Sequence, residues 1–426
     1  MTTFGIPELL DEVVAAYQAK SPVSARLFPR FKAALAGGET RSILYHAPYP
    51  LVIQRGVGAE LIDVDGNTYI DALNNYTSLV HGNAYGPIVE AVVRAMESTG
   101  SAHAGLHSSQ VELAELLQDR FPAAERIRFT NSGSEATILA MRIARAATGR
   151  RRYVAFLGGY HGSVPEFIDG DPQVIRVPFN DIEALANAVD EDTAAVFAEP
   201  FLGSGGVIGA DAGFLEAAGA IAHDHGALFI LDEVQSLRNA FSGVHGELRL
   251  DVDLVTMGKI IGGGLPVGAV AGSAGLMTMT AAAAGGPVIH SGTFNGNVAT
   301  MVAGLASMQA LNATRIERMN KAAVMLAARI ESVGEALNLP LTVTRAGSIM
   351  QVHFRSAAPR NVAEAREPRL DWVRALHLAL LVEGVYTAPR GMLNLSTAMM
   401  DDDLDAIGNA YDRALRRIDS GLSRHG

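Results

Sequence analysis

The chain lacks cysteine altogether among its 426 residues, so it can form neither disulfide bonds nor thiolate metal sites. It has no apolar run of the roughly 18 residues that a membrane-spanning helix needs. Its first residues also lack the basic stretch and apolar run of a secretory signal. The formal net charge of −11 argues against nucleic acid or an anionic membrane as a partner. These absences predict a soluble protein of the cytoplasm.

Lysine is scarce as well. Of the 34 basic residues, only four are lysines: Lys20, Lys32, Lys259 and Lys321. Lys259 stands apart because it lies between an apolar, strand-like run (253–257) and three glycines (262–264). A desolvated amine has a lowered pKa and can attack carbonyl groups. The alternative for this stretch alone is a lysine that reaches solvent from a loop.

The order of the expected elements predicts an α/β protein. A helix is expected over 8–36, followed by short strands around an Asp65-Gly66 hairpin turn. From about residue 86, helices alternate with short apolar strands, which predicts a mostly parallel sheet covered on both faces. Ligands of such sheets lie at the carboxyl ends of the strands. From about residue 340 a second α+β domain is expected, packed with the N-terminal segment. The strands expected in the large sheet are 126–130, 153–157, 174–177, 194–198, 228–231, 254–257 and 269–272, and the helices expected around them include 181–189, 212–225 and a long helix over 298–338.

Two segments after expected strands could hold a phosphorylated, planar ligand. In the first, a strand runs through Gly133 into a helix, with Ser132 and Glu135 at the spacing of a capping box. Free N–H groups at such a helix start favour a phosphate, although an ordinary capped helix explains the pattern equally well. In the second, Tyr160 and His161 are flanked by glycines, which would let the rings approach a ligand; a turn with a core tyrosine is the alternative.

Two further segments point to the same place. Asp232 ends the apolar run 227–231, where an unpaired carboxylate is costly. A protonated pyridine nitrogen would be a suitable partner, whereas helix capping is the alternative. The polar, glycine-rich segment 291–297 before the long helix is another candidate anion site. No metal site is predicted, because no histidine or second carboxylate other than Glu233 lies at ligand spacing.

Taken together, these segments resemble the class III aminotransferases, which are fold-type I pyridoxal-phosphate enzymes. The resemblance rests on residues 131–136, 160–162, 231–234 and 258–259, and it covers nearly the whole chain. It implies a large domain with a mostly parallel seven-stranded sheet and a small α+β domain built from both termini. The corresponding division is 1–75 for the N-terminal segment, 76–320 for the large domain and 321–426 for the C-terminal part.

The resemblance also implies the roles of individual residues. Lys259 would form the Schiff base with pyridoxal 5′-phosphate, and Asp232 would face the pyridinium nitrogen. Thr293 would reach the phosphate of the other subunit in a homodimer. The remaining residues implied to bind the cofactor are Ser132, Gly133 and Ser134 at the phosphate, Tyr160, His161 and Val234 around the ring, and Gln235 at the phenolic oxygen.

Two subgroups of the class are similar to different parts of the chain. Residues 259–268 look most like glutamate-1-semialdehyde aminomutase. Residues 41–50 and 386–391 are similar to the aromatic β-amino-acid (β-phenylalanine) aminotransferases, in which the arginines matching Arg41 and Arg390 bind substrate carboxylates. The chain departs from the second subgroup at Gln235-Ser236, where Met-Thr is expected. Surface salt bridges are the alternative role for both arginines.

These observations predict an aminotransferase that moves the amino group of a β-amino acid to a keto acid, such as 2-oxoglutarate or pyruvate, by a ping-pong mechanism. An aminomutase that moves the amino group within one molecule is the first alternative. Arg390 counts against it, because a carboxylate clamp for an acceptor would be idle in an intramolecular reaction. A non-catalytic binding protein is the second alternative, and the presence of both Lys259 and Asp232 counts against it. Racemase or decarboxylase activity on the same cofactor stays open.

Overall fold

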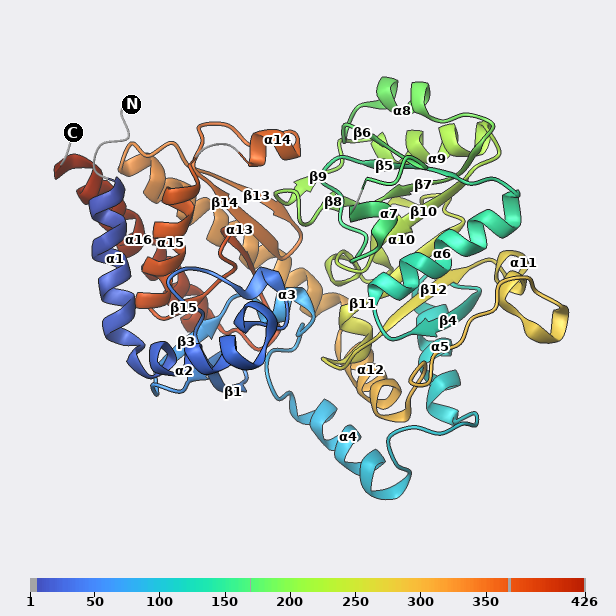
Figure 1. Ribbon diagram of the computed structural model, residues 1–426, viewed down its shortest axis with the longest axis horizontal. Coiled ribbons are helices and arrows are strands. Elements are labelled where there is room, and N and C mark those ends of the chain that lie inside the picture. Colours follow the sequence, from blue (N-terminus) through green and yellow to red (C-terminus); the bar gives the residue numbers. More distant parts are fainter. Residues whose placement is uncertain (1–5, 169, 367–368, 425–426) are drawn as a thin grey trace.

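The computed structural model describes residues 6–168, 170–366 and 369–424. The chain forms two parts that lie side by side (Figure 1). One part is built around a large sheet from the middle of the chain, and the other combines elements from both ends. No helix within the described ranges is long and apolar enough to cross a membrane.

The large sheet has seven strands, in the order β4-β12-β11-β10-β7-β5-β6. Its strands run parallel except β12, which pairs antiparallel with both β4 and β11. The predicted mostly parallel, seven-stranded sheet is therefore confirmed. The strands are β4 (Arg126–Thr130), β5 (Arg152–Phe156), β6 (Val174–Val177), β7 (Thr193–Ala198), β10 (Leu228–Asp232), β11 (Leu254–Gly258) and β12 (Gly268–Gly272).

Both faces of the sheet are covered, as its apolar strands require. On β7, Ala195 and Phe197 belong to the core on one face with α6, whereas Val196 and Ala198 belong to the core on the other face with α8 and α9. The helices and the small hairpin of this part are α4 (Gly86–Ser98), α5 (Ser108–Arg120), α6 (Gly133–Thr148), α7 (Pro165–Ile168), α8 (Ile182–Ala188), β8 (Phe201–Leu202), β9 (Ile208–Gly209), α9 (Phe214–Asp224), α10 (Gly243–Leu248), α11 (Ala274–Met277) and α12 (Val298–Ala310).

The other part joins the two ends of the chain in one core. β15 pairs in parallel with β3, so a C-terminal strand extends an N-terminal sheet of order β1-β2-β3-β15. A second sheet has the order β13-β14-β16. The elements are α1 (Ile6–Lys20), α2 (Pro22–Ala34), β1 (Ile53–Val57), β2 (Glu60–Asp63), β3 (Thr68–Asp71), α3 (Asn74–Thr77), α13 (Ala313–Ala336), β13 (Thr342–Ala346), β14 (Ile349–His353), α14 (Val362–Ala365), α15 (Leu370–Val382), β15 (Val385–Tyr386), β16 (Met392–Asn394) and α16 (Asp401–Arg424).

Two helices predicted as continuous are interrupted. The expected helix over 8–36 divides at Ser21, because Pro22 has no N–H to donate and begins α2 instead. The expected helix over 298–338 divides at Leu311, because the side chain of Asn312 accepts a hydrogen bond from the N–H of Arg315 and so starts α13. In both cases a local capping signal outweighs a continuous apolar pattern.

Arg238 connects the two parts of the molecule. It lies on the short 3₁₀ helix η3 (Leu237–Asn239) and is fully buried. Its guanidinium donates hydrogen bonds to Asn394 Oδ1 at 2.9 Å, to Thr77 O at 3.3 Å and to Leu395 O. None of these acceptors is a carboxylate, and burial lowers the pKa of Arg238 to about 9.

We expect Arg238→Met to lower the free energy of unfolding by roughly 2 kcal/mol. The substitution leaves several buried acceptors without donors, and this loss exceeds the gain from removing a desolvated charge. Urea denaturation of the two proteins measures the difference. Arg345→Met, at an exposed position of β13, is the control. Equal changes in the free energy of unfolding would show that the buried hydrogen bonds of Arg238 do not stabilise the fold.

Candidate active site

The carboxyl ends of β10 and β11 bring two predicted residues to one edge of the sheet. The strands run in parallel with Asp232 opposite Thr256. β11 ends at Gly258, and Lys259 begins the 3₁₀ helix η4 (Lys259–Gly262). Lys259 has a φ of 50°, a left-handed conformation that is uncommon for a residue with a side chain. The turn thus holds the lysine in an unusual backbone conformation directly after the strand.

The Lys259 amine lies in a desolvated, charged environment. Burial lowers its pKa, whereas the carboxylates of Asp232 and Glu199 act in the opposite direction. Arg390 lowers the pKa further, so all three side chains lie within electrostatic reach of the amine. A lowered pKa increases the fraction of unprotonated amine, which is the form that attacks a carbonyl carbon.

The buried carboxylate of Asp232 is paired with His161. His161 Nδ1 lies 2.8 Å from Asp232 Oδ2, and the other carboxylate oxygen accepts a hydrogen bond from the N–H of Val234. Burial alone would lower the pKa of His161, but the hydrogen bond to Asp232 and the charges of Asp232 and Glu199 raise it. Both carboxylate oxygens of Asp232 are therefore hydrogen-bonded at the place where the ring nitrogen is expected.

Glu199 is a site residue that the sequence analysis missed. It follows β7 and accepts hydrogen bonds from the N–H groups of Tyr160 at 2.9 Å and Gly203 at 3.4 Å. Burial raises its pKa to about 7, Asp232 adds to this, and His161 opposes it. The sequence does carry a signal for Glu199, because this acid directly follows the expected apolar strand 194–198, just as Asp232 ends an apolar run.

The start of α6 provides an anion site. Ser132 caps the helix by accepting a hydrogen bond from the N–H of Glu135 at 3.2 Å. The N–H groups of Gly133 and Ser134 have no acceptor among the described residues. The expected capping box is only half formed, because the Glu135 carboxylate accepts from the N–H of Asn131 rather than from that of Ser132. Two free amides and the helix dipole therefore face the place where a phosphate is expected.

The Tyr160–Gly162 segment packs directly against this helix start. A Cβ on Gly162 would lie only 2.6 Å from Ser134 Cα, and Gly162 has a φ of 89°. Glycine is therefore required for the segment to approach the helix. The N–H of Ser163 donates to Ser134 Oγ at 3.0 Å, and the ring of Tyr160 stays exposed.

The other predicted cofactor residues take different positions. Val234 lies next to Gly133, where an added Cβ would meet its side chain at 3.0 Å. Gln235 is half-buried, with its amide 4.0 Å from Met392 Sδ. Thr293 is exposed in the segment before α12. That segment is tied to the start of α6 by a hydrogen bond of 2.7 Å from Asn131 to Asn295.

Tyr76 brings the two predicted substrate arginines together, although they lie near opposite ends of the chain. The guanidinium carbons of Arg41 and Arg390 lie 5.9 Å and 5.7 Å from the centre of the Tyr76 ring. Arg41 also donates to Asn75 Oδ1 at 3.0 Å. Neither arginine makes an ion pair with a described acid, in contrast to the alternative of surface salt bridges.

The turn that carries Tyr76 is strained. Four consecutive residues, Asn74 to Thr77, have φ angles between 46° and 76°, and each left-handed residue costs about 1–2 kcal/mol. Surrounding contacts hold the turn: Asn74 Nδ2 donates to Asn394 O at 3.0 Å, Tyr76 Oη donates to Ile43 O at 2.8 Å, and Thr77 O accepts from Arg238. Backbone strain of this kind occurs where surrounding structure imposes a functional geometry.

The chemical groups of these residues match those that pyridoxal phosphate needs. The site offers one amine with a lowered pKa, a buried carboxylate for a protonated ring nitrogen, and free backbone amides for a phosphate. The described residues contain no group of three metal-ligating side chains.

Comparisons with known proteins agree with this chemistry. The sequence model of the family described as aminotransferase class III matches residues 44–168 and 163–406. A beta-phenylalanine transaminase from Variovorax paradoxus is 36% identical, over 100% of this chain and 98% of that protein. A glutamate-1-semialdehyde 2,1-aminomutase from Anoxybacillus flavithermus is 34% identical, over 88% of this chain and 92% of that protein.

A solved structure described as a transaminase with PLP bound is also similar. It superimposes with a TM-score of 0.86 at 30% identity, over 94% of this chain and 98% of the other.

We expect Glu199→Gln to stabilise the cofactor-free protein at high pH relative to the unsubstituted protein. An acid whose pKa is raised on folding, here from 4.5 to about 7, binds its proton more tightly in the folded state. Stability is therefore lost as the pH rises through this window, and glutamine removes that loss. The stability difference should grow by about 2 kcal/mol between roughly pH 5 and pH 8.

Urea denaturation at both pH values measures this difference. Glu247→Gln, which removes the same charge from an exposed position of α10, is the control. A difference that does not change with pH would show that Glu199 is ionised throughout.

Proposed function

Because the chain belongs to the class III aminotransferases, which use pyridoxal 5′-phosphate, we propose that it transfers the amino group of a β-amino acid to a keto acid. The observation that carries this proposal is the placement of Arg41 and Arg390 at one tyrosine ring, with Arg390 within electrostatic reach of Lys259. Two guanidinium groups suit an enzyme whose two substrates, taken in turn, both carry carboxylates.

Pyridoxal phosphate, when bound, supplies an aldehyde that takes up the amino group and a ring that draws electrons from the reacting carbon. Lys259 would bind the aldehyde carbon and later carry the proton to and from the substrate carbon. Asp232, supported by His161, would keep the ring nitrogen protonated. Gly133 and Ser134, at the helix start capped by Ser132, would hold the phosphate through their amides.

Other side chains would orient the cofactor and the substrates. Tyr160 would cover one face of the ring, Val234 would pack on the other, and Gln235 would reach the phenolic oxygen. Arg41 would bind the carboxylate of the β-amino acid. With a dicarboxylic acceptor such as 2-oxoglutarate, Arg390 would meet the α-carboxylate while Arg41 takes the distal one. Donor and acceptor would thus use the same site in turn, which would give ping-pong kinetics.

We also propose a homodimer, in which Thr293 of the partner subunit reaches the phosphate. Val89, Val93 and Met96 are exposed along α4 at helical spacing, and Leu106 follows them in the chain with a side chain that is almost fully exposed. A second copy of the chain would cover this apolar surface. The domain boundaries at residues 75 and 320, the cytoplasmic location and pyruvate as an acceptor stay predictions from the sequence.

The aminomutase is the second candidate, and the similarity to glutamate-1-semialdehyde 2,1-aminomutase favours it. A half-reaction screen separates the two functions. The holoenzyme is mixed with (R)- and (S)-β-phenylalanine, β-alanine, glutamate semialdehyde and α-amino acids, and the cofactor absorbance is followed. Conversion by a β-amino acid, reversed by 2-oxoglutarate or pyruvate, supports the aminotransferase. Conversion of glutamate semialdehyde without any acceptor, and with no response to β-amino acids, overturns it.

We expect Arg41→Ala to raise KM for β-amino acids by roughly 10–100-fold, because a charge-assisted contact to a carboxylate contributes about 1.5–3 kcal/mol. Simple amines without a carboxylate should react as before. Steady-state kinetics with β-phenylalanine and 1-phenylethylamine measure both effects. Equal losses on the two donors would contradict the proposed role of Arg41.

A further inference from the structure

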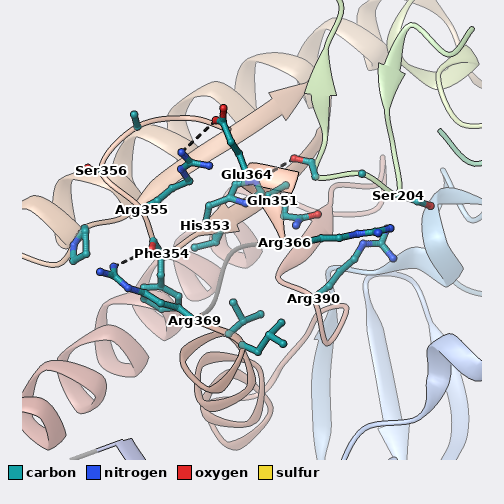
Figure 2. Close-up of a pocket in the computed structure, with 18 residues that line it drawn as sticks. Ser204, Gln351, His353, Phe354, Arg355, Ser356, Glu364, Arg366, Arg369 and Arg390 are labelled. Carbon is teal, nitrogen blue, oxygen red and sulfur yellow. Dashed lines mark hydrogen bonds and ion pairs between the residues drawn. The ribbon is translucent and has the colours of Figure 1, made fainter. Parts of the chain in front are cut away.

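A cavity of about 590 Å³ is lined in part by Arg390. It lies between the turn around Ser204, the β14 strand and the segment that follows α14 (Figure 2). Four arginines line it: Arg355, Arg366, Arg369 and Arg390. Glu364 is the single acid among its described lining residues, so the cavity carries a strong excess of positive charge.

Two of the four arginines have partners within the protein. Arg355 Nη2 lies 3.3 Å from Glu364 Oε2. Arg369 donates to Phe354 O at 2.9 Å, and its guanidinium lies 5.0 Å from the centre of the Trp372 ring. These contacts use the only described acid of the cavity and hold Arg369 at its far end (Figure 2).

Neither of the other two arginines forms an ion pair with a described residue. The side chain of Arg366 makes no hydrogen bond or ion pair with any described residue. Arg390 makes a hydrogen bond of 3.4 Å to Gly203 O and lies 3.0 Å from Met392 Sδ, and its buried Nε has no acceptor. Figure 2 shows both side chains running toward the same end of the cavity, near Ser204.

Two guanidinium groups that line one cavity, neither of them in an ion pair with a described residue, favour the binding of an anion there. A carboxylate suits this position, because its two oxygens can each accept from a guanidinium edge. Arg390 also faces the Lys259 site, since its charge acts on that amine. Arg390 therefore links this cavity to the lysine site, where a substrate would present an anionic group.

We propose that Arg366 and Arg390 together bind the α-carboxylate of the keto-acid acceptor, which makes Arg366 a residue that determines acceptor specificity. This inference rests on the proposed aminotransferase function. Arg41 takes the single carboxylate of the donor and the distal carboxylate of the acceptor. The α-carboxylate, which only the acceptor presents here, is left to Arg390 and Arg366, so Arg366 acts in the acceptor half of the cycle.

Equilibrium binding tests the site without turnover. Isothermal titration calorimetry of glutarate, an unreactive dicarboxylate, into the holoenzyme compares the unsubstituted protein with Arg366→Gln. We expect at least tenfold weaker binding in the variant. Arg360→Gln is the matched control, because it removes the same charge from a largely exposed side chain of the same segment, outside the cavity. Unchanged binding in Arg366→Gln, or an equal loss in both variants, overturns the proposal.

Half-reaction kinetics then separate the two substrates. In Arg366→Gln, the rate with a β-amino acid donor should not change, whereas KM for 2-oxoglutarate should rise at least tenfold with little change in kcat. An uncharged aldehyde acceptor such as butanal should react as in the unsubstituted protein, and Arg366→Lys should recover part of the loss. Equal losses on donor, keto acid and aldehyde would show a structural role and contradict the proposal.

Failure of this inference differs from failure of the proposed function. If the unsubstituted enzyme accepts no β-amino acid, the aminotransferase proposal fails. If it transfers the amino group normally but Arg366→Gln has unchanged kinetics and unchanged glutarate binding, only the role of Arg366 fails.

Discussion

The pairing of a buried carboxylate with a positive partner is the constraint on which this site depends. Asp232 is almost fully buried at the end of a parallel strand and stays paired only with His161 and the N–H of Val234. Glu199 adds a second buried acid, and the half-buried Lys259 lies within the field of both. Such a cluster is costly in a protein interior unless its charges are matched. A cofactor with a protonated ring nitrogen supplies a positive charge for these carboxylates. The charges that are unfavourable in the empty site therefore favour binding of such a cofactor.

A second constraint positions the substrate groups. The left-handed turn from Asn74 to Thr77 is unfavourable by itself, yet it places Tyr76 between two arginines and Asn75 against one of them. Arg238 donates hydrogen bonds to Thr77 O and to Asn394 of β16. A buried arginine from the large-sheet part therefore helps to hold the turn in place. The strain is thus maintained by contacts from three distant segments of the chain. The interface between the two parts therefore fixes the positions of the two arginines that we propose to bind substrate.

The proposed substrate contacts are all made by arginine, whose planar, permanently charged group suits two-point contacts with carboxylates. Arg41 comes from the N-terminal segment, whereas Arg366 and Arg390 come from the C-terminal part. The near absence of lysine has a corresponding effect, since one amine is left at the end of β11 while the other three lie elsewhere in the chain. In the proposed function, carboxylate binding and covalent chemistry therefore belong to different residue types.

The sequence by itself determined the α/β class, the seven strands of the large sheet within a residue or two, and the lysine and aspartate at its edge. These features follow from local patterns: apolar runs, glycine turns, and a charge placed where burial is expected. Over 8–36 and 298–338 a continuous apolar pattern predicts one helix, whereas the chain forms two in each range, the second starting at Pro22 and after the capping residue Asn312. Only the tertiary structure decided that Glu199 faces the same site, that Tyr76 joins Arg41 to Arg390, and that Arg366 lines the same cavity as Arg390. These contacts join residues that are tens to hundreds of positions apart in the sequence. Their proximity in space depends on how strands and helices pack, and no local pattern encodes it.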